Sequence, residues 1–187
     1  MGAVNGLVQL LPVSLIYSGT SASIGANGLV TLTAVTSFDV VSVFSNDYDH
    51  YQINMTLTGV SGNAALVSRL LSGITAESTA SSYTSIDVQT AATTYPSNGA
   101  VTGTSMPRAS VYQTVYTSSQ VFIGNPYKTN IPTSIKALTQ EGVTNSTPFL
   151  DLQWGNHILW NRYDGIEFYS SGGETFSGTF SIYGMRK

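Results

Sequence analysis

The residues of this sequence that could do chemistry are few and far apart. Asp47 and Asp49 flank Tyr48 at a spacing at which two carboxylates could share a cation. A calcium loop needs several more oxygen ligands, so we expect a polar corner whose Asp side chains cap local backbone amides. His50 and His157 are the only histidines, and neither lies at metal-ligand spacing from another ligand type. The sequence therefore predicts no metal site and no cofactor.

Signals for hydrolytic chemistry are equally thin. The sequence contains no Gly-x-Ser-x-Gly nucleophile elbow and no glycine-rich phosphate cradle before a helix. A glycoside hydrolase needs two carboxyl groups at a defined separation across a sugar. Four acidic residues could in principle supply them: Asp151, Asp164, Glu167 and Glu174. Glu167 alternates with apolar neighbours and is predicted to point to solvent. We expect no enzymatic activity, with a carbohydrate-active hydrolase as an alternative.

Aromatic side chains are the stronger functional signal. Eleven Tyr and two Trp occur in a chain with 9% charged residues. Rigid amphipathic rings of this kind are typical of protein interfaces and of sugar-binding surfaces. Trp154 and Trp160 share one predicted strand face with aliphatic residues, which predicts a place in the core. Five tyrosines next to polar or loop residues are the predicted interface or ligand-binding candidates: Tyr83, Tyr95, Tyr112, Tyr116 and Tyr127.

The composition of the chain indicates its class. The 187 residues are 42% hydrophobic, which suffices for one domain with a sizeable core. The 9% of charged residues compares with about 25% in ordinary soluble domains. Thr, Val, Tyr, Ser and Gly take their place, and strand formers with turn formers predict an all-β domain. Seven Lys plus Arg at a net charge of -3 argue against nucleic-acid binding. Without cysteine, no disulfide can form.

The first residues form a separate unit in this prediction. We expect an apolar N-terminal arm over residues 1–12, before a β-sandwich domain over residues 13–187. Residues 4–15 resemble the apolar part of a signal peptide, but they lack a positive leading region and Pro12 interrupts them. No stretch is long enough to span a bilayer, so neither export by this segment nor membrane insertion is expected. The arm is either mobile or docks on a neighbouring subunit through Val4, Leu7, Val8, Leu10 and Leu11.

Turn signals divide the rest of the chain into short extended runs. Asn27-Gly28 favours a tight turn before residues 29–33. Residues 38–44 form a dense apolar run, and residues 50–58 alternate cleanly, which places Tyr51, Ile53, Met55 and Leu57 inward. Residues 64–71 are predicted as a strand, because Ser72-Gly73 would stop a helix within two turns.

The middle of the chain gives weak strand signals, whereas its C-terminal end alternates clearly. Residues 77–103 are poor in large apolar residues and are predicted to hold one strand and long loops. Residues 175–185 place Phe176, Phe180 and Ile182 on one side and hydroxyl residues on the other, so a C-terminal strand should close the fold. About ten such strands predict a jelly-roll-like antiparallel β-sandwich.

Several segments carry a family resemblance, namely residues 43–53, 69–73, 125–126, 164–168 and 178–187. Together they resemble small virion structural proteins of tailed bacteriophages, which are often labelled minor tail proteins or tail-fibre tips. The resemblance extends over most of the chain from Ser14 onward and implies a jelly-roll-like sandwich, often trimeric, displayed on the virion. Two features depart from it. Arg69 precedes two leucines where the family pattern suggests another basic residue, and no long fibrous shaft precedes the domain, which suits a capsid decoration protein equally well.

The low charge supports self-assembly on independent grounds. A chain with so few charges must expose neutral patches, and such patches usually mark interaction surfaces. Ring-closing symmetry would bury them, and the resemblance implies a trimer. The expected function is that of a non-enzymatic phage virion structural protein of the tail, a fibre tip or receptor-binding component made in the host bacterial cytoplasm. Its expected partners are itself, other virion proteins and a host surface glycan. The alternative is a capsid decoration (cement) protein that stabilises the head shell.

Overall fold

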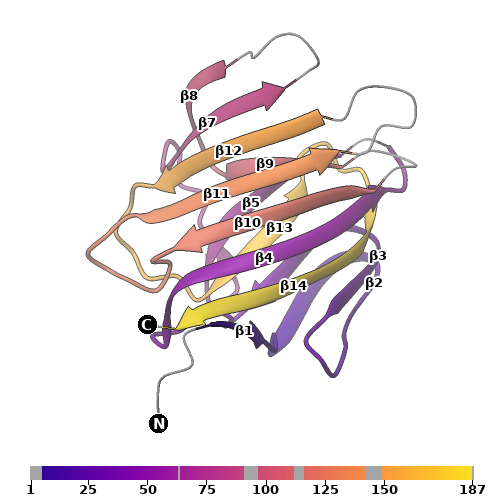
Figure 1. The fold of residues 1–187 in the computed structure, drawn as a ribbon, viewed down its shortest axis with the longest axis horizontal. Helices are drawn as coiled ribbons and strands as arrows, with labels where there is room; N and C mark the ends of the chain where they lie inside the picture. Colours follow the sequence, from indigo (N-terminus) through magenta and orange to yellow (C-terminus); the bar gives the residue numbers. More distant parts are fainter. Residues whose placement is uncertain (1–5, 63, 91–96, 112–115, 142–148, 187) are drawn as a thin grey trace.

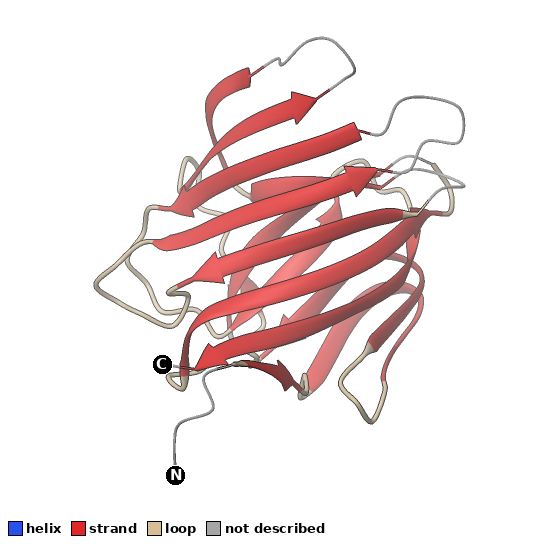
Figure 2. Ribbon diagram, viewed as in Figure 1, coloured by secondary structure: helices blue, strands red, loops and turns tan. Residues whose placement is uncertain are grey.

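The computed structural model describes residues 6–62, 64–90, 97–111, 116–141 and 149–186. These residues form fourteen β-strands and no helix, and therefore contain no helix that could cross a membrane (Figure 2). The strands are β1 (Leu7–Leu10), β2 (Ser14–Ile24), β3 (Val30–Val41), β4 (Tyr48–Gly59), β5 (Ala64–Ser72), β6 (Thr75–Ala76), β7 (Tyr83–Thr90), β8 (Ser97–Gly103), β9 (Met106–Val111), β10 (Thr117–Gly124), β11 (Thr133–Glu141), β12 (Phe149–His157), β13 (Gly165–Ser170) and β14 (Phe176–Arg186).

The strands pair antiparallel and build a sheet that folds over on itself into two layers (Figure 1). The front layer runs β14-β4-β10-β11-β12-β7-β8, and the back layer contains β2, β3, β13, β5 and β9. β3 belongs to both layers, because Val30 to Val35 pair with β14 whereas residues 37–40 pair with β13. Ala34, between these two stretches, has a φ of 44°. The fold is a jelly-roll-like antiparallel β-sandwich, as the sequence predicts.

The core lies between the two layers and is rich in phenylalanine. The ring of Phe38 in β3 stacks on Phe180 of β14 at 4.8 Å and on Phe168 of β13 at 5.2 Å. Phe180 and Ile182 are at most 1% exposed, so the predicted alternation of the C-terminal run is confirmed. The predicted inward residues of β4 are buried as well: Tyr51, Ile53, Met55 and Leu57. β14 lies beside β4 in the sheet and closes the fold.

The strand count exceeds the predicted ten in two regions. Residues 77–103 contain β7 and β8 instead of one strand and long loops. These strands lie at the edge of the front layer. A strand there needs fewer large apolar side chains than one at the centre, so the composition predicted too few strands. In contrast, residues 30–33 and 38–41, from two runs predicted separately, are parts of one strand, β3. The predicted strand over residues 64–71 is confirmed as β5.

Leu7–Leu10 of the predicted N-terminal arm form a strand of the domain, β1. β1 pairs with β14 from Leu7 opposite Met185 to Leu10 opposite Ile182. The sheet therefore begins at Leu7, before the boundary predicted at residue 13. Leu7 is 49% and Leu11 62% exposed, so docking of these side chains on another protein stays a prediction. Val4 lies outside the described residues.

Candidate ligand-binding groove

β12 points apolar side chains to solvent and polar side chains to the interior. Leu150 and Trp154 are 38% and 40% exposed, whereas Asp151 and Gln153 are 1% and 2% exposed. The prediction that Trp154 is a core residue is therefore wrong, and so is that for Trp160, which follows β12 and is 60% exposed. Alternation shows that neighbours in a strand lie on opposite faces, but it does not show which face is buried.

Hydrogen bonds explain how polar groups are accommodated inside this half of the sandwich. Gln153 donates through Nε2 to Oδ2 of Asp151 at 2.7 Å. The hydroxyl groups of Ser119 and Thr139, on neighbouring strands, lie 3.0 Å apart. β9 lies against β11 and β12 on this inner side. Because buried polar groups are stable when they are hydrogen-bonded, the inner face of β12 needs no apolar residues.

The outer face of the front layer holds an open groove of about 740 Å³. It crosses five neighbouring strands, β14, β4, β10, β11 and β12. Its side-chain lining combines aromatic, cationic, hydroxyl and amide groups, which are the groups that bind polar ligands with apolar faces. The residues that line it include His50, Phe122, Ser134, Lys136, Trp154 and Asn156.

One cross-strand row of the groove is aromatic and cationic. Lys136 on β11 lies opposite Phe122 on β10 and opposite Trp154 on β12. Adjacent strands are about 4.8 Å apart, so the lysine stands between the two aromatic residues on one face. Phe122 is 37% exposed and Trp154 40%. Gln52 on β4 extends the row on the far side of Phe122.

A second row is polar and contains a gap. His50 on β4, Gly124 on β10, Ser134 on β11 and Asn156 on β12 lie opposite one another in turn. A Cβ atom on Gly124 would lie 2.6 Å from Oγ of Ser134 and 3.3 Å from Nδ1 of His50. The absence of a side chain at Gly124 thus lets the Ser134 hydroxyl and the His50 ring approach each other over the groove floor.

Amides and hydroxyl groups continue this face beyond the groove. Gln52 donates through Nε2 to Oδ1 of Asn54 at 2.8 Å. Gln52 also lies opposite Tyr183 of β14, whose hydroxyl accepts a hydrogen bond from Ser181 Oγ at 3.3 Å. The outer face of β4 and β14 therefore offers further polar groups to a ligand that crosses the strands.

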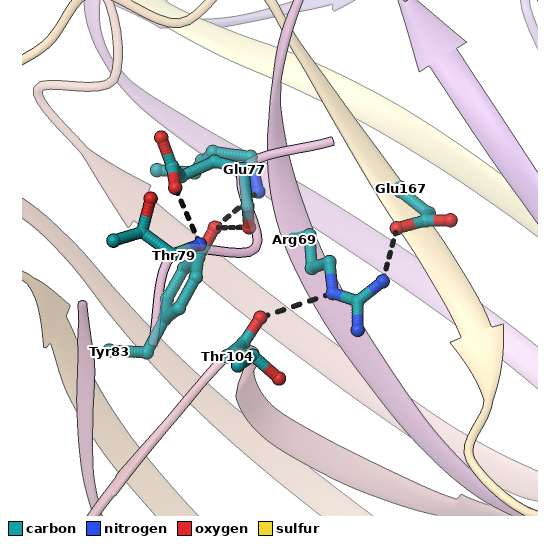
Figure 3. A network of polar contacts seen from close by, with 7 residues as sticks. Arg69, Glu77, Thr79, Tyr83, Thr104 and Glu167 are labelled. Atoms are coloured by element: carbon teal, nitrogen blue, oxygen red, sulfur yellow. Dashed lines mark hydrogen bonds and ion pairs between the residues drawn. The ribbon is translucent and has the colours of Figure 1, made fainter. Parts of the chain in front are cut away.

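Tyr83, a predicted ligand-binding residue, belongs to the core. Its side chain is 0% exposed, and its hydroxyl accepts from the Leu70 amide at 3.1 Å and donates to the Glu77 carbonyl at 2.8 Å (Figure 3). Burial raises the pKa of the Tyr83 hydroxyl above its ordinary value. The prediction is wrong because Tyr83 begins β7 and turns its side chain inward to Leu70 and Glu77, although residues 78–81 of the preceding loop are exposed.

The other predicted tyrosines give no groove residue within the described chain. Tyr116, next to β10, is 71% exposed. Tyr127 is partly buried beneath Arg162, whose Cζ lies 4.7 Å from the ring centroid. Tyr116 and Tyr127 do not line the groove, and their role at an interface stays a prediction. Tyr95 and Tyr112 lie outside the described residues. The alternation of β12 could have revealed the groove if its apolar side chains had been assigned to the solvent face of the sheet.

The four acidic hydrolase candidates lie on separate elements, and none lines the groove. Asp151 is in the interior. Asp164 Oδ1 accepts from the Gly73 amide at 2.9 Å, and Glu174 Oε2 accepts from Ser170 Oγ at 2.7 Å. Each carboxylate therefore serves a local structural contact, and no two of them face each other across the groove.

Glu167 does not point to solvent as predicted. Its side chain is 18% exposed and lies 3.7 Å from Arg69, which also donates through Nε to the Thr104 carbonyl at 3.1 Å (Figure 3). Burial raises the pKa of Glu167, and the Arg69 charge opposes this. Asp39 lies directly opposite Glu167 in β3. Burial and, to a smaller extent, the Glu167 charge raise the pKa of Asp39 to about 6.

His157 and the Asp47 corner have local partners. Ser45 Oγ donates to Asp47 Oδ2 and accepts from the Asp47 amide, each at 3.2 Å. His157 is buried, and its Nδ1 lies 3.2 Å from the Leu159 carbonyl oxygen. Burial lowers the pKa of His157. Within the described ranges, no three His, Cys, Asp or Glu side chains are grouped as a metal site would require.

Comparison with known proteins gives little beyond the fold. No protein-family model matches the chain, and no curated protein matches it. Among solved structures, the chain is similar to a marine PL-14 alginate lyase from Aplysia kurodai, with 11% sequence identity and a TM-score of 0.39. The similarity covers 94% of this chain and 86% of the lyase. At this TM-score the likeness supports no statement about activity.

Proposed function

We propose that this chain is a non-enzymatic virion surface protein of a tailed bacteriophage that attaches to its host by binding a surface glycan in the groove. The observation that carries the glycan part is the outward, half-exposed Trp154, which lies beside Lys136 and on the same face as Phe122. Aromatic rings bind the apolar faces of sugars, and amides and hydroxyl groups bind their edges. The virion part rests on the sequence resemblance.

The shape and chemistry of the groove favour a glycan over a flat protein partner. An exposed apolar patch often marks a protein interface. Here, however, the aromatic residues line a hollow that also contains Ser134, Asn156 and the charged Lys136. The centre of a protein interface is usually depleted of charged residues. A concave surface with a few polar groups between apolar ones is typical of a ligand site.

The test is binding of host surface polysaccharide by the full chain, measured by calorimetry and by attachment of labelled protein to host cells. We expect Trp154→Ala to weaken both by about five- to tenfold, since stacking on one ring contributes on the order of 1–1.5 kcal/mol. Trp160→Ala is the matched control, because Trp160 is exposed but does not line the groove. Equal affinity of Trp154→Ala and wild type, or no glycan binding, would contradict the proposal.

A capsid decoration protein is the second candidate. The observation that favours it is the exposure of Leu7, Leu11 and Val13 near the start of the domain, where apolar side chains could contact a shell. Immunogold labelling of intact virions separates the two candidates. Gold at the tail tip or fibres supports host attachment, whereas gold spread over the head supports decoration.

A further inference from the structure

We infer that the groove binds an anionic glycan, and that Lys136 holds its carboxylate or phosphate group between the rings of Phe122 and Trp154. This inference rests on the proposed function and adds the chemical class of the ligand and the residue that selects it. Two observations support the inference: the positive charge of the groove lining and the register of β10, β11 and β12.

Two of the side chains that line the groove can carry positive charge. They are Lys136 and His50, and no Asp or Glu lines it, although the whole chain has more acidic than basic residues. Within the described part of the chain, the ion pairs are Arg69 with Glu167 and Lys128 with Asp49. The Lys136 ammonium is therefore not neutralised by a described acidic partner, and an anion entering the groove would meet it directly.

The register places the cation where a bound sugar would present an acid group. Lys136 is on the central strand of three, with Phe122 and Trp154 directly opposite it on either side. A sugar ring stacked on Trp154 therefore lies within reach of the lysine side chain. Lys136 is exposed, so water partly screens its attraction to an anion, and stacking on the adjacent rings adds to that attraction.

The polar row supplies contacts for the rest of the sugar. His50 and Ser134 approach each other over Gly124, and hydroxyl groups of a ligand could bind both side chains there. Both rows run across the strands, so a chain of sugars would extend from Trp154 toward Gln52. This direction favours a linear polysaccharide over a single small anion.

The experiment compares three probes by titration calorimetry on the full chain: polygalacturonate oligosaccharides, poly(glycerol phosphate) chains and neutral dextran oligosaccharides. We expect at least one anionic probe to bind about tenfold or more tightly than dextran, because a charge-assisted hydrogen bond contributes on that scale. The first two probes distinguish carboxylate from phosphate. Lys136→Gln should remove this preference, and Arg162→Gln, which removes one charge outside the groove, should not.

The outcomes separate the inference from the proposed function. Equal binding of dextran and both anionic probes, with no effect of Lys136→Gln, would overturn the anionic preference and leave glycan binding intact. Absence of binding to all three probes would overturn both. Gly124→Val fills the groove floor without requiring a positive φ at this position. Full retention of binding by this variant, with an unchanged circular dichroism spectrum, would show that the anion binds elsewhere.

Discussion

Gln153 and Trp154 are neighbours in β12 and lie on opposite sides of one sheet, with Gln153 2% and Trp154 40% exposed. The polar residue of the pair is inside and the largest apolar residue is outside. The polar residue is stable inside because it is hydrogen-bonded. The exposed apolar ring is explained if it binds a ligand or another protein. The pair therefore links the stability of the sandwich to its proposed binding function.

Stability measurements on the two positions should show this inversion. We expect Gln153→Ala to lower the free energy of unfolding by about 1–3 kcal/mol, because it removes the hydrogen bond to buried Asp151. Trp154→Ala should lower it by less than about 1 kcal/mol, since the ring is largely outside the core. Urea denaturation measures both. A larger effect of Trp154→Ala would mean that the tryptophan is a core residue.

The hydroxyl group of Tyr83 should contribute to stability through two buried hydrogen bonds. Tyr83→Phe leaves the Leu70 amide without its 3.1 Å acceptor and the Glu77 carbonyl without its donor. We expect a loss of about 1–3 kcal/mol in thermal or urea unfolding. Tyr116→Phe, at a position 71% exposed, is the control and should have no measurable effect. Comparable stability of the two variants would contradict this account of Tyr83.

The carboxylate pair Asp39 and Glu167 should make stability fall as pH rises. The pKa of Asp39 increases from an ordinary 3.8 to about 6 on folding, so the folded state binds this proton more tightly than the unfolded state. The contribution is complete below pH 3.8 and is lost as pH rises through 6. Because the side chain is partly exposed, screening reduces the effect to roughly 1 kcal/mol.

Asp39→Asn tests this dependence, since the amide has no charge to desolvate. Relative to wild type, the variant should gain stability between pH 4 and pH 7, as measured by urea unfolding at each pH. Glu167 and Arg69 face the same site and are unchanged in this comparison. A difference between variant and wild type that does not change with pH would contradict the pKa shift.

Removal of the chain after Gly178 should prevent folding. The deletion removes Phe180 and Ile182 from the core, and each large side chain contributes roughly 1.5–3 kcal/mol. It also removes the pairing of the second half of β14 with β4 and β1. Together these losses are on the scale of the whole stability of a domain, about 5–15 kcal/mol. Soluble truncated protein with a cooperative unfolding transition would contradict the role of β14.

The sequence by itself was enough to predict the class of the fold and several of its strands. The alternation in β4 and β14 placed Ile53, Leu57, Phe180 and Ile182 inward, and all four are buried. This worked because strands at the centre of a sandwich bury one side against a single apolar core, so the apolar face is the inner face. Low charge with many strand and turn formers similarly indicated an all-β domain.

Only the tertiary structure decided which face of β12 is buried and which residues meet in the groove. Trp154, Lys136 and Phe122 come from three strands, and their alignment depends on register between segments far apart in the sequence. The burial of Tyr83 and Glu167 likewise depends on what folds over them. Periodicity reports that neighbouring side chains point in opposite directions, but the side that faces the core is determined by the layer packed against it.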